Sequence, residues 1–405
     1  MSSTSPKKLN VEFVLLMAFM TSIMALGIDA VLPALSFIED DLNIDSVVKV
    51  QYIVSVIFMG FGLGQLFYGP LSDAIGRKKP VYMGGLVFLI GCAISYLSTN
   101  LEVMLVGRFL QGLGAASFRI ISMAIIRDEY SGVAMAKTLS IVMTVFILVP
   151  VLAPTIGQFI LFFGPWRYIF LMLFILSILI MIWFSLRQTE TLPIENRKRL
   201  SAKFFISATI EIFLNPISFS ATFVSGLIFG VMITYISSAQ HIFQDIYELG
   251  EKFPLFFGSL AFTIGVASLL NSKLLNYFGI LRLIKFSLII MSSSSLIFLV
   301  YLNLAGYQVP PLSVLMIYLG VFFFCLGLLF GNLNTLALNP MGHIAGFAAS
   351  IIGSVQSFVS VAVGILVSTL FQDNFMTLAL CFTIVSGLSF LIIKVGEFKN
   401  IYSEA

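Results

Sequence analysis

The sequence predicts an all-α membrane protein with twelve transmembrane helices, arranged as two pseudo-symmetric six-helix bundles. The first observation is composition: of 405 residues, 59% are hydrophobic and only 10% are charged, and the mean hydropathy is +1.06. Soluble domains carry about 25% charged residues, so a soluble fold of this length lacks the polar surface it would need. The second observation is the regular spacing of long apolar segments, and the third is the uneven distribution of lysine and arginine between the connections.

A helix needs about 20 apolar residues to cross the hydrocarbon core of a bilayer. Twelve segments meet this requirement in order along the chain: 11–35, 47–69, 80–98, 101–125, 137–163, 167–187, 213–238, 252–275, 282–304, 311–335, 344–368 and 374–395. The first of them is far longer than the apolar core of a signal peptide, so it is interpreted as a membrane helix.

The connections alternate in charge. With the N-terminus in the cytoplasm, seventeen of the 22 Lys and Arg residues fall on the inner side, three on the outer side and two inside the fourth span. This bias follows the positive-inside rule. We therefore expect a multi-pass protein of the bacterial inner (plasma) membrane with both termini in the cytoplasm.

The longest polar interruption divides the chain into halves. We expect an N-terminal six-helix bundle over 1–190, a cytoplasmic linker over 191–212 and a C-terminal six-helix bundle over 213–405. A constant shift lays Gly62 on Gly265, Asp73 on Asn276 and Gly76 on Gly279, so the halves are interpreted as repeats. Paired repeats around a central site are typical of transporters.

The sequence lacks the motifs that mark several classes of function. There is no Walker-type phosphate loop, nucleophile elbow or zinc motif, so we expect neither an enzyme nor a cofactor or metal, and transport energy would come from an ion gradient. Cys92, Cys325 and Cys381 all lie in apolar runs and are interpreted as packing residues. No basic run with interleaved aromatic residues indicates nucleic acid, which leaves a small-molecule substrate and the lipid bilayer as partners.

Asp29 is the only acid of the sequence that lies well inside a predicted span. Because a charge is costly there, such an acid is a functional candidate. Ser22, Ala25 and Asp29 share one helix face through spacings of three and four. Pro33 follows and removes a helical hydrogen bond, which favours a bend there. A purely structural alternative is that Asp29 pairs with an arginine or a free backbone amide.

The fourth span carries two cations, Arg108 and Arg119, three turns apart and thus on one face. A guanidinium does not lose its proton in proteins, so it needs a carboxylate, carbonyls or a wet cavity, and both side chains are expected to point into the protein. Arg119 could instead extend towards the inner surface. Gln111 and Gly112 lie between them, in a run of small residues that lets a neighbouring helix approach closely.

Other spans offer a kink and polar groups. Pro150, Pro154 and Gly157 in the fifth span predict a bend that serves either as a hinge or simply as packing. The second half has no mid-span acid, and its polar candidates for a substrate cavity, together with Ser22 and Arg119, are Tyr235, Asn332, Asn334 and Gln356. Such groups equally well bond helices to one another.

The segment Gly69-Pro-Leu-Ser-Asp73-Ala-Ile-Gly76-Arg77-Lys78-Lys resembles the motif loop of major facilitator superfamily transporters. Met24-Ala-Leu-Gly-Ile-Asp29, Arg108-x-x-Gln-Gly-x-Gly, Arg127-Asp128, Ala153-Pro154-x-x-Gly157, Pro165-Trp166-Arg167 and Glu190-Thr-Leu192 follow the same order as in its Bcr/CflA branch of drug:proton antiporters. The likeness is dense over 20–192 and thinner afterwards.

This resemblance implies proton-coupled efflux of small-molecule drugs such as chloramphenicol or bicyclomycin, by alternating access, with the protein acting as a monomer. It assigns Asp29 and Arg108 to proton coupling, Gly69, Asp73, Gly76, Arg77 and Lys78 to a cytoplasmic latch, Gln111 and Gly112 to the fourth-span motif, and Pro150, Pro154 and Gly157 to the antiporter motif. The sequence departs from the family pattern in Ala153 and Gln158, and Arg119 is an additional cation that favours anionic or neutral substrates if it faces the cavity. The alternatives are a dedicated exporter or importer of one solute, such as a siderophore or amino acid derivative, and a membrane receptor or channel.

Overall fold

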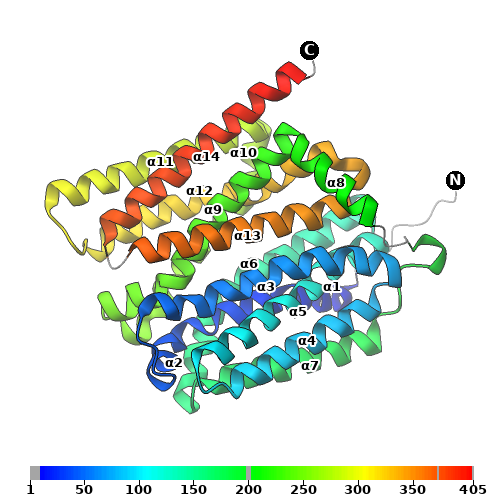
Figure 1. The fold of residues 1–405 in the computed structure, drawn as a ribbon, viewed down its shortest axis with the longest axis horizontal. Coiled ribbons are helices and arrows are strands. Elements are labelled where there is room, and N and C mark those ends of the chain that lie inside the picture. Colours follow the sequence, from blue (N-terminus) through cyan, green and yellow to red (C-terminus); the bar gives the residue numbers. More distant parts are fainter. Residues whose placement is uncertain (1–9, 198–201, 372–373, 404–405) are drawn as a thin grey trace. The chain divides into compact units, whose positions relative to one another are not determined.

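The computed structural model describes residues 10–197, 202–371 and 374–403, and every regular element in these ranges is a helix (Figure 1). Four of the cations expected on the inner side lie outside the described residues: Lys7, Lys8, Lys198 and Arg199. The described part contains eleven helices long and apolar enough to cross a membrane, and one of these, Leu312–Phe371, comprises two successive helices. The predicted all-α membrane fold is confirmed.

By their contacts the residues fall into two compact units. Unit 1 is Met1–Ile44 with Val56–Ser201, and unit 2 is Asp45–Ser55 with Ala202–Ala405. The elements up to the linker are α1 (Val11–Asp29), the 3₁₀ turn η1 (Leu32–Ala34), α2 (Leu35–Asp41), α3 (Val47–Ile75), α4 (Lys78–Tyr96), α5 (Leu101–Glu129), α6 (Gly132–Phe163), α7 (Arg167–Arg187) and η2 (Ile194–Asn196). In unit 1, α5 packs against α1 and α4, while α1 also packs against α6 and α7.

The elements after the linker are α8 (Ala202–Leu214), α9 (Pro216–Gln240), the π-helical turn η3 (His241–Ile246), η4 (Gly250–Lys252), α10 (Phe253–Phe278), α11 (Ile280–Ala305), α12 (Leu312–Leu338), η5 (Asn339–Ile344), α13 (Ala345–Phe371) and α14 (Phe375–Ser403). Helix α9 packs against α12, α13 and α14, and α12 also packs against α10 and α11.

The structure changes two predicted connections. Residues 69–75, expected in the motif loop, form the last turns of α3, so Gly69 and Asp73 are helical and only Gly76 and Arg77 connect α3 to α4. An ion pair from Arg77 back to Asp73 and a hydrogen bond from Ser72 Oγ to the Gly69 carbonyl favour the added turns. The helix stops at Gly76 because its φ of 94° lies in the left-handed region that favours glycine.

The expected polar linker also contains a helix. Helix α8 covers most of its second half and lies against α9 and α13. Ala208 and Ile212 are buried, and the ring of Phe205 packs edge-on against Phe347. These apolar residues of α8 share one face of the helix, which packs against the rest of the unit. The charged residues of the segment made it read as a polar linker in the sequence.

Both units contain the same backbone feature at the positions matched by the internal shift. Gly76 follows α3 and Gly279 follows α10, and both have positive φ, 94° and 71°. A left-handed residue ends each helix and allows the next to begin at once. This local match agrees with the interpretation of the halves as repeats.

Candidate functional site

The predicted bend after Asp29 is confirmed. Pro33 lacks an N–H and its ring would collide with the carbonyl four residues earlier, which is that of Asp29. Helix α1 therefore ends at Asp29, the chain makes a 3₁₀ turn that contains Pro33, and α2 follows. Asp29 is 3% exposed at the end of α1, and Ser22 and Ala25 on the same face are buried too.

Arg108 is held against this broken helix. It is fully buried, and its Nη1 donates to the carbonyl oxygen of Gly27 at 2.8 Å, in the last turn of α1. The same nitrogen donates to Gln111 Oε1 at 2.8 Å, and the guanidinium lies 5.8 Å from the ring centre of Phe170 on α7. A backbone carbonyl is one of the partners that an arginine inside a membrane requires.

Gln111 links this arginine to α4. Its Nε2 donates to Ser95 Oγ at 3.0 Å and to the Gly91 carbonyl at 3.3 Å, while its Oε1 accepts from Arg108. Both ends of the amide are thus used, which fixes its orientation. From the sequence, Gln111 was only a residue of the fourth-span motif. The structure shows that its Oε1 accepts a hydrogen bond from Arg108 and so helps to orient the guanidinium.

Gly157 on α6 lies against the same break in α1. A Cβ on Gly157 would lie 2.0 Å from the Ala30 carbonyl oxygen and 3.0 Å from Pro33 Cγ. Helix α6 can approach α1 here only because residue 157 has no side chain. Pro154 is buried nearby in the sequence, Pro150 is half-buried, and α6 remains one helix through both prolines.

The candidate site of unit 1 therefore comprises the end of α1, Arg108 and Gln111 on α5, and Gly157 on α6. The structure brings Arg108 to the turn that ends in Asp29. Proton coupling through these two side chains remains a prediction.

A second polar cluster lies between α3 and α4. Arg77 donates to Asp73, to Asp128 Oδ2 at 2.8 Å and to Ser72 Oγ at 2.9 Å. Burial of Arg77 opposes its charge, but the hydrogen bonds and charges of Asp128 and Asp73 outweigh this and raise the pKa of the guanidinium. The predicted latch residue Arg77 is thus bound to two carboxylates of its own unit.

Glu190 was not assigned a role from the sequence, and the structure gives it one. Its carboxylate accepts hydrogen bonds from the backbone N–H groups of Arg77 at 2.8 Å, Lys78 at 3.1 Å and Leu192 at 3.1 Å. It therefore caps the start of α4, which satisfies donors that have no partner within the helix. Burial alone raises its pKa, but these N–H groups lower it more, and the net pKa lies below the ordinary value.

The predicted cavity residues of unit 2 do not form one cluster. Asn332 pairs its amide with that of Asn271 at 2.8 and 3.2 Å, and so joins α12 to α10. Asn334 donates to the Phe330 carbonyl one turn back, and Gln356 is buried on α13. The ring of Tyr235 stacks on Phe257 and meets Phe323 edge-on, with ring centres 5.7 and 4.5 Å apart.

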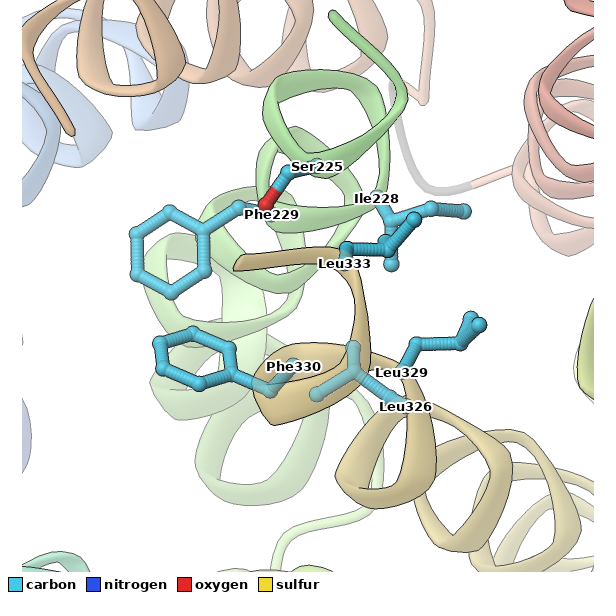
Figure 2. A pocket seen from close by; sticks show the side chains of 7 residues that line it. All are labelled: Ser225, Ile228, Phe229, Leu326, Leu329, Phe330 and Leu333. Carbon is cyan, nitrogen blue, oxygen red and sulfur yellow. The ribbon is translucent and has the colours of Figure 1, made fainter. Parts of the chain in front are cut away.

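Unit 2 contains a very small apolar cavity between α9 and α12, with a volume of about 10 Å³ (Figure 2). The figure shows the rings of Phe229 and Phe330 on one side of it and aliphatic side chains on the other. Its lining is Ser225, Ile228, Phe229, Leu326, Leu329, Phe330 and Leu333. None of the predicted cavity residues is in this lining, which apart from Ser225 is apolar.

Across the described ranges, no group of three or more His, Cys, Asp or Glu residues could hold a metal ion.

A family model described as the Major Facilitator Superfamily matches residues 17–365. The "Uncharacterized MFS-type transporter YdgK" of Bacillus subtilis is 31% identical over 368 residues, which cover 87% of this chain and 89% of the relative. The "Bicyclomycin resistance protein homolog" of Haemophilus influenzae is 27% identical over 401 residues, covering 96% and 97%.

A solved structure shows the same fold. The xylose transporter XylE from E. coli superimposes with a TM-score of 0.73 and 13% identity, covering 94% of this chain and 96% of that one.

Proposed function

This chain belongs to the Major Facilitator Superfamily and is a multi-pass inner-membrane transporter rather than an enzyme, and we propose that it exports small-molecule drugs in exchange for protons. Transporters of this superfamily need no cofactor. We assign the energy source to the proton gradient, place both termini in the cytoplasm and treat the monomer as the working unit. The resemblance to a bicyclomycin resistance protein homolog over nearly the whole chain supports drug efflux.

One observation carries the coupling part of this proposal: the fully buried Arg108 is tied to the last turn of α1, which ends at the buried Asp29. The other described acids lie near helix ends or in connections. When Asp29, two residues after the carbonyl that binds Arg108, gains or loses a proton, the local charge changes by one unit. In a low dielectric such a change affects substrate binding strongly.

The proposed cycle follows from competition at Asp29. Substrate binds from the cytoplasm or the inner leaflet while Asp29 is ionised. A proton from outside then neutralises Asp29, which weakens substrate binding and promotes release. Gln111 acts as a positioning residue, because it holds Arg108 through Oε1 while its own amide is bound to α4.

The test uses energised inside-out vesicles from a host without its own efflux pumps. Chloramphenicol and a panel of neutral, anionic and cationic compounds are added, and proton release is recorded. We expect wild type to release protons with at least one compound and Asp29→Asn to release none. Asp45→Asn is the matched control, because Asp45 is an exposed acid outside the helices that pairs with Lys49, one turn away.

Each outcome decides between functions. Release that persists in Asp29→Asn assigns coupling to another acid. Absence of release in wild type with verified protein in the membrane favours a dedicated transporter of one solute.

A further inference from the structure

Arg119 has no role in the proposed proton coupling, and it lies close to two aromatic rings. Its guanidinium carbon lies 4.9 Å from the ring centre of Phe146 on α6 and 5.7 Å from that of Phe61 on α3. The three side chains come from three helices and meet inside unit 1. A cation near two ring faces is attracted by their electron density, which favours this placement over one in lipid.

Close helix packing fixes the position of Phe61. A Cβ on Gly112 of α5 would lie 1.9 Å from the Ile57 carbonyl oxygen and 2.9 Å from the Phe61 backbone nitrogen. A Cβ on Gly64 of α3 would lie 2.6 Å from Ala116 Cβ. The two backbones therefore touch over more than one turn, and Phe61 cannot move away from α5 without separating them.

The charge of Arg119 is not balanced within the part of the chain that the structure describes. None of those residues forms a salt bridge or a hydrogen bond with its side chain, whereas Arg77 binds two carboxylates and Arg167 binds Asp41. The residue is mostly buried but keeps some exposed surface in the structure. Arg119 lies ten residues before the end of α5, about 15 Å along the helix axis, and so within the membrane span.

A permanently charged guanidinium in a membrane span needs an anion or strong acceptors. Its N–H groups match the oxygens of a carboxylate or sulfonate in a forked geometry. The neighbouring rings supply apolar contact for a flat aromatic body next to that anionic group.

We propose that Arg119, Phe61 and Phe146 form a binding site for the anionic group of aromatic organic anions, so that the transporter accepts aromatic carboxylates or sulfonates. This inference rests on the proposed export function and names a substrate class for it.

The experiment measures equilibrium binding of two matched probes to the purified protein in phosphatidylcholine nanodiscs by isothermal titration calorimetry. Naphthalene-2-sulfonate carries a fixed negative charge, and naphthalene-2-sulfonamide is its neutral analogue of nearly the same shape. We expect wild type to bind the sulfonate more tightly. Arg119→Gln should weaken sulfonate binding about tenfold or more, as expected for losing a hydrogen-bonded charge, with a much smaller effect on the sulfonamide.

Two further variants separate a binding role from a structural one. Arg119→Lys keeps the charge but loses the forked geometry, so it should retain part of the preference for the sulfonate. Arg127→Gln is the matched control, because Arg127 is an exposed arginine two turns later on the same helix and should leave the preference unchanged. If Arg119→Gln fails to fold, Arg119→Lys decides the matter through its reduced preference.

Equal binding of the two probes by wild type, no binding of either, or an unchanged preference in Arg119→Gln and Arg119→Lys would overturn the proposal. Displacement of the sulfonate by added phosphatidylglycerol, dependent on Arg119, would assign the site to a lipid headgroup and also overturn it. The proton-release assay with chloramphenicol tests the export function separately. Proton release without a sulfonate preference removes only this site, and a sulfonate preference without any proton release removes only the export function.

Discussion

Replacing Gly157 by alanine tests whether the antiporter motif acts through contact with the break in α1. The new Cβ would lie 2.0 Å from the Ala30 carbonyl oxygen and 2.9 Å from its carbon, and real Cβ atoms essentially never come within 3.0 Å of a neighbour. Helix α6 must therefore move by about 1 Å or the break must rearrange. Overpacking of this kind costs about 1–3 kcal/mol.

The assay combines thermal unfolding of the purified protein with proton release in vesicles. Gly157→Ala should melt at least about 2 °C below wild type, and proton release should fall because Asp29 and Gly27 lie in the displaced segment. Gly320→Ala is the matched control: it lies inside α12, and a Cβ there meets nothing within 4 Å. Alanine in that position should be neutral or stabilise the helix by up to about 1 kcal/mol.

A melting temperature of Gly157→Ala equal to that of wild type or of Gly320→Ala would refute the reasoning. It would mean that the approach of α6 to Ala30 does not limit the packing of unit 1. Lower stability with unchanged proton release would keep the packing argument and remove the link to coupling.

Three more substitutions follow from the contacts. Glu190→Ala removes the cap of α4 and should destabilise unit 1 by about 1 kcal/mol, whereas Glu195→Ala, at an equally exposed acid of the same connection, should not. The folded-state pKa of Glu190 is lowered, so its contribution is present above the ordinary pKa of about 4.5 and is lost as pH falls below it; melting curves from pH 7 to pH 4 that keep the difference between Glu190→Ala and wild type constant would contradict this. Gln111→Leu removes an acceptor from the buried Arg108 and should cost about 1–3 kcal/mol, measured by thermal unfolding, and lower proton release; unchanged values for both would deny its positioning role. Asn332→Ala should lower stability by about 0.6–2 kcal/mol through loss of the pair with Asn271 and leave the range of compounds that evoke proton release unchanged; an altered range would return Asn332 to the substrate cavity.

The positions of the helices could be predicted because hydropathy and breakers are local properties. Apolar length defined the spans, and Pro33 predicted a bend, which the structure places directly after the end of α1 at Asp29. Helix α3 was expected to end at residue 69, but it continues to Ile75 and stops at Gly76. The predicted loop was too long, since an ion pair one turn apart extended α3 through residue 75. Helix α8 was missed because its charged residues concealed an apolar face.

The partners of the site residues could not be predicted in the same way. Composition and spacing selected Asp29, Arg108 and Arg119 as costly groups inside spans, but a span has neighbours on several sides. Arg108 binds a carbonyl of α1 and an amide of its own helix, while Arg119 lies by rings of α3 and α6. Asn332 had two open interpretations, and its pairing with Asn271 shows that it bonds helices together.

The sequence by itself therefore determined the fold class, the membrane location, the place where α1 breaks and the identity of the charged groups inside the spans. These follow from the transfer cost of each residue and from backbone chemistry within a few positions. Only the tertiary structure decided that Glu190 caps α4, that Gly157 fits against Ala30 and that Arg119 meets Phe61 and Phe146. Each of these contacts joins segments far apart in the chain, so it depends on how helices rotate and approach one another, which no local pattern specifies.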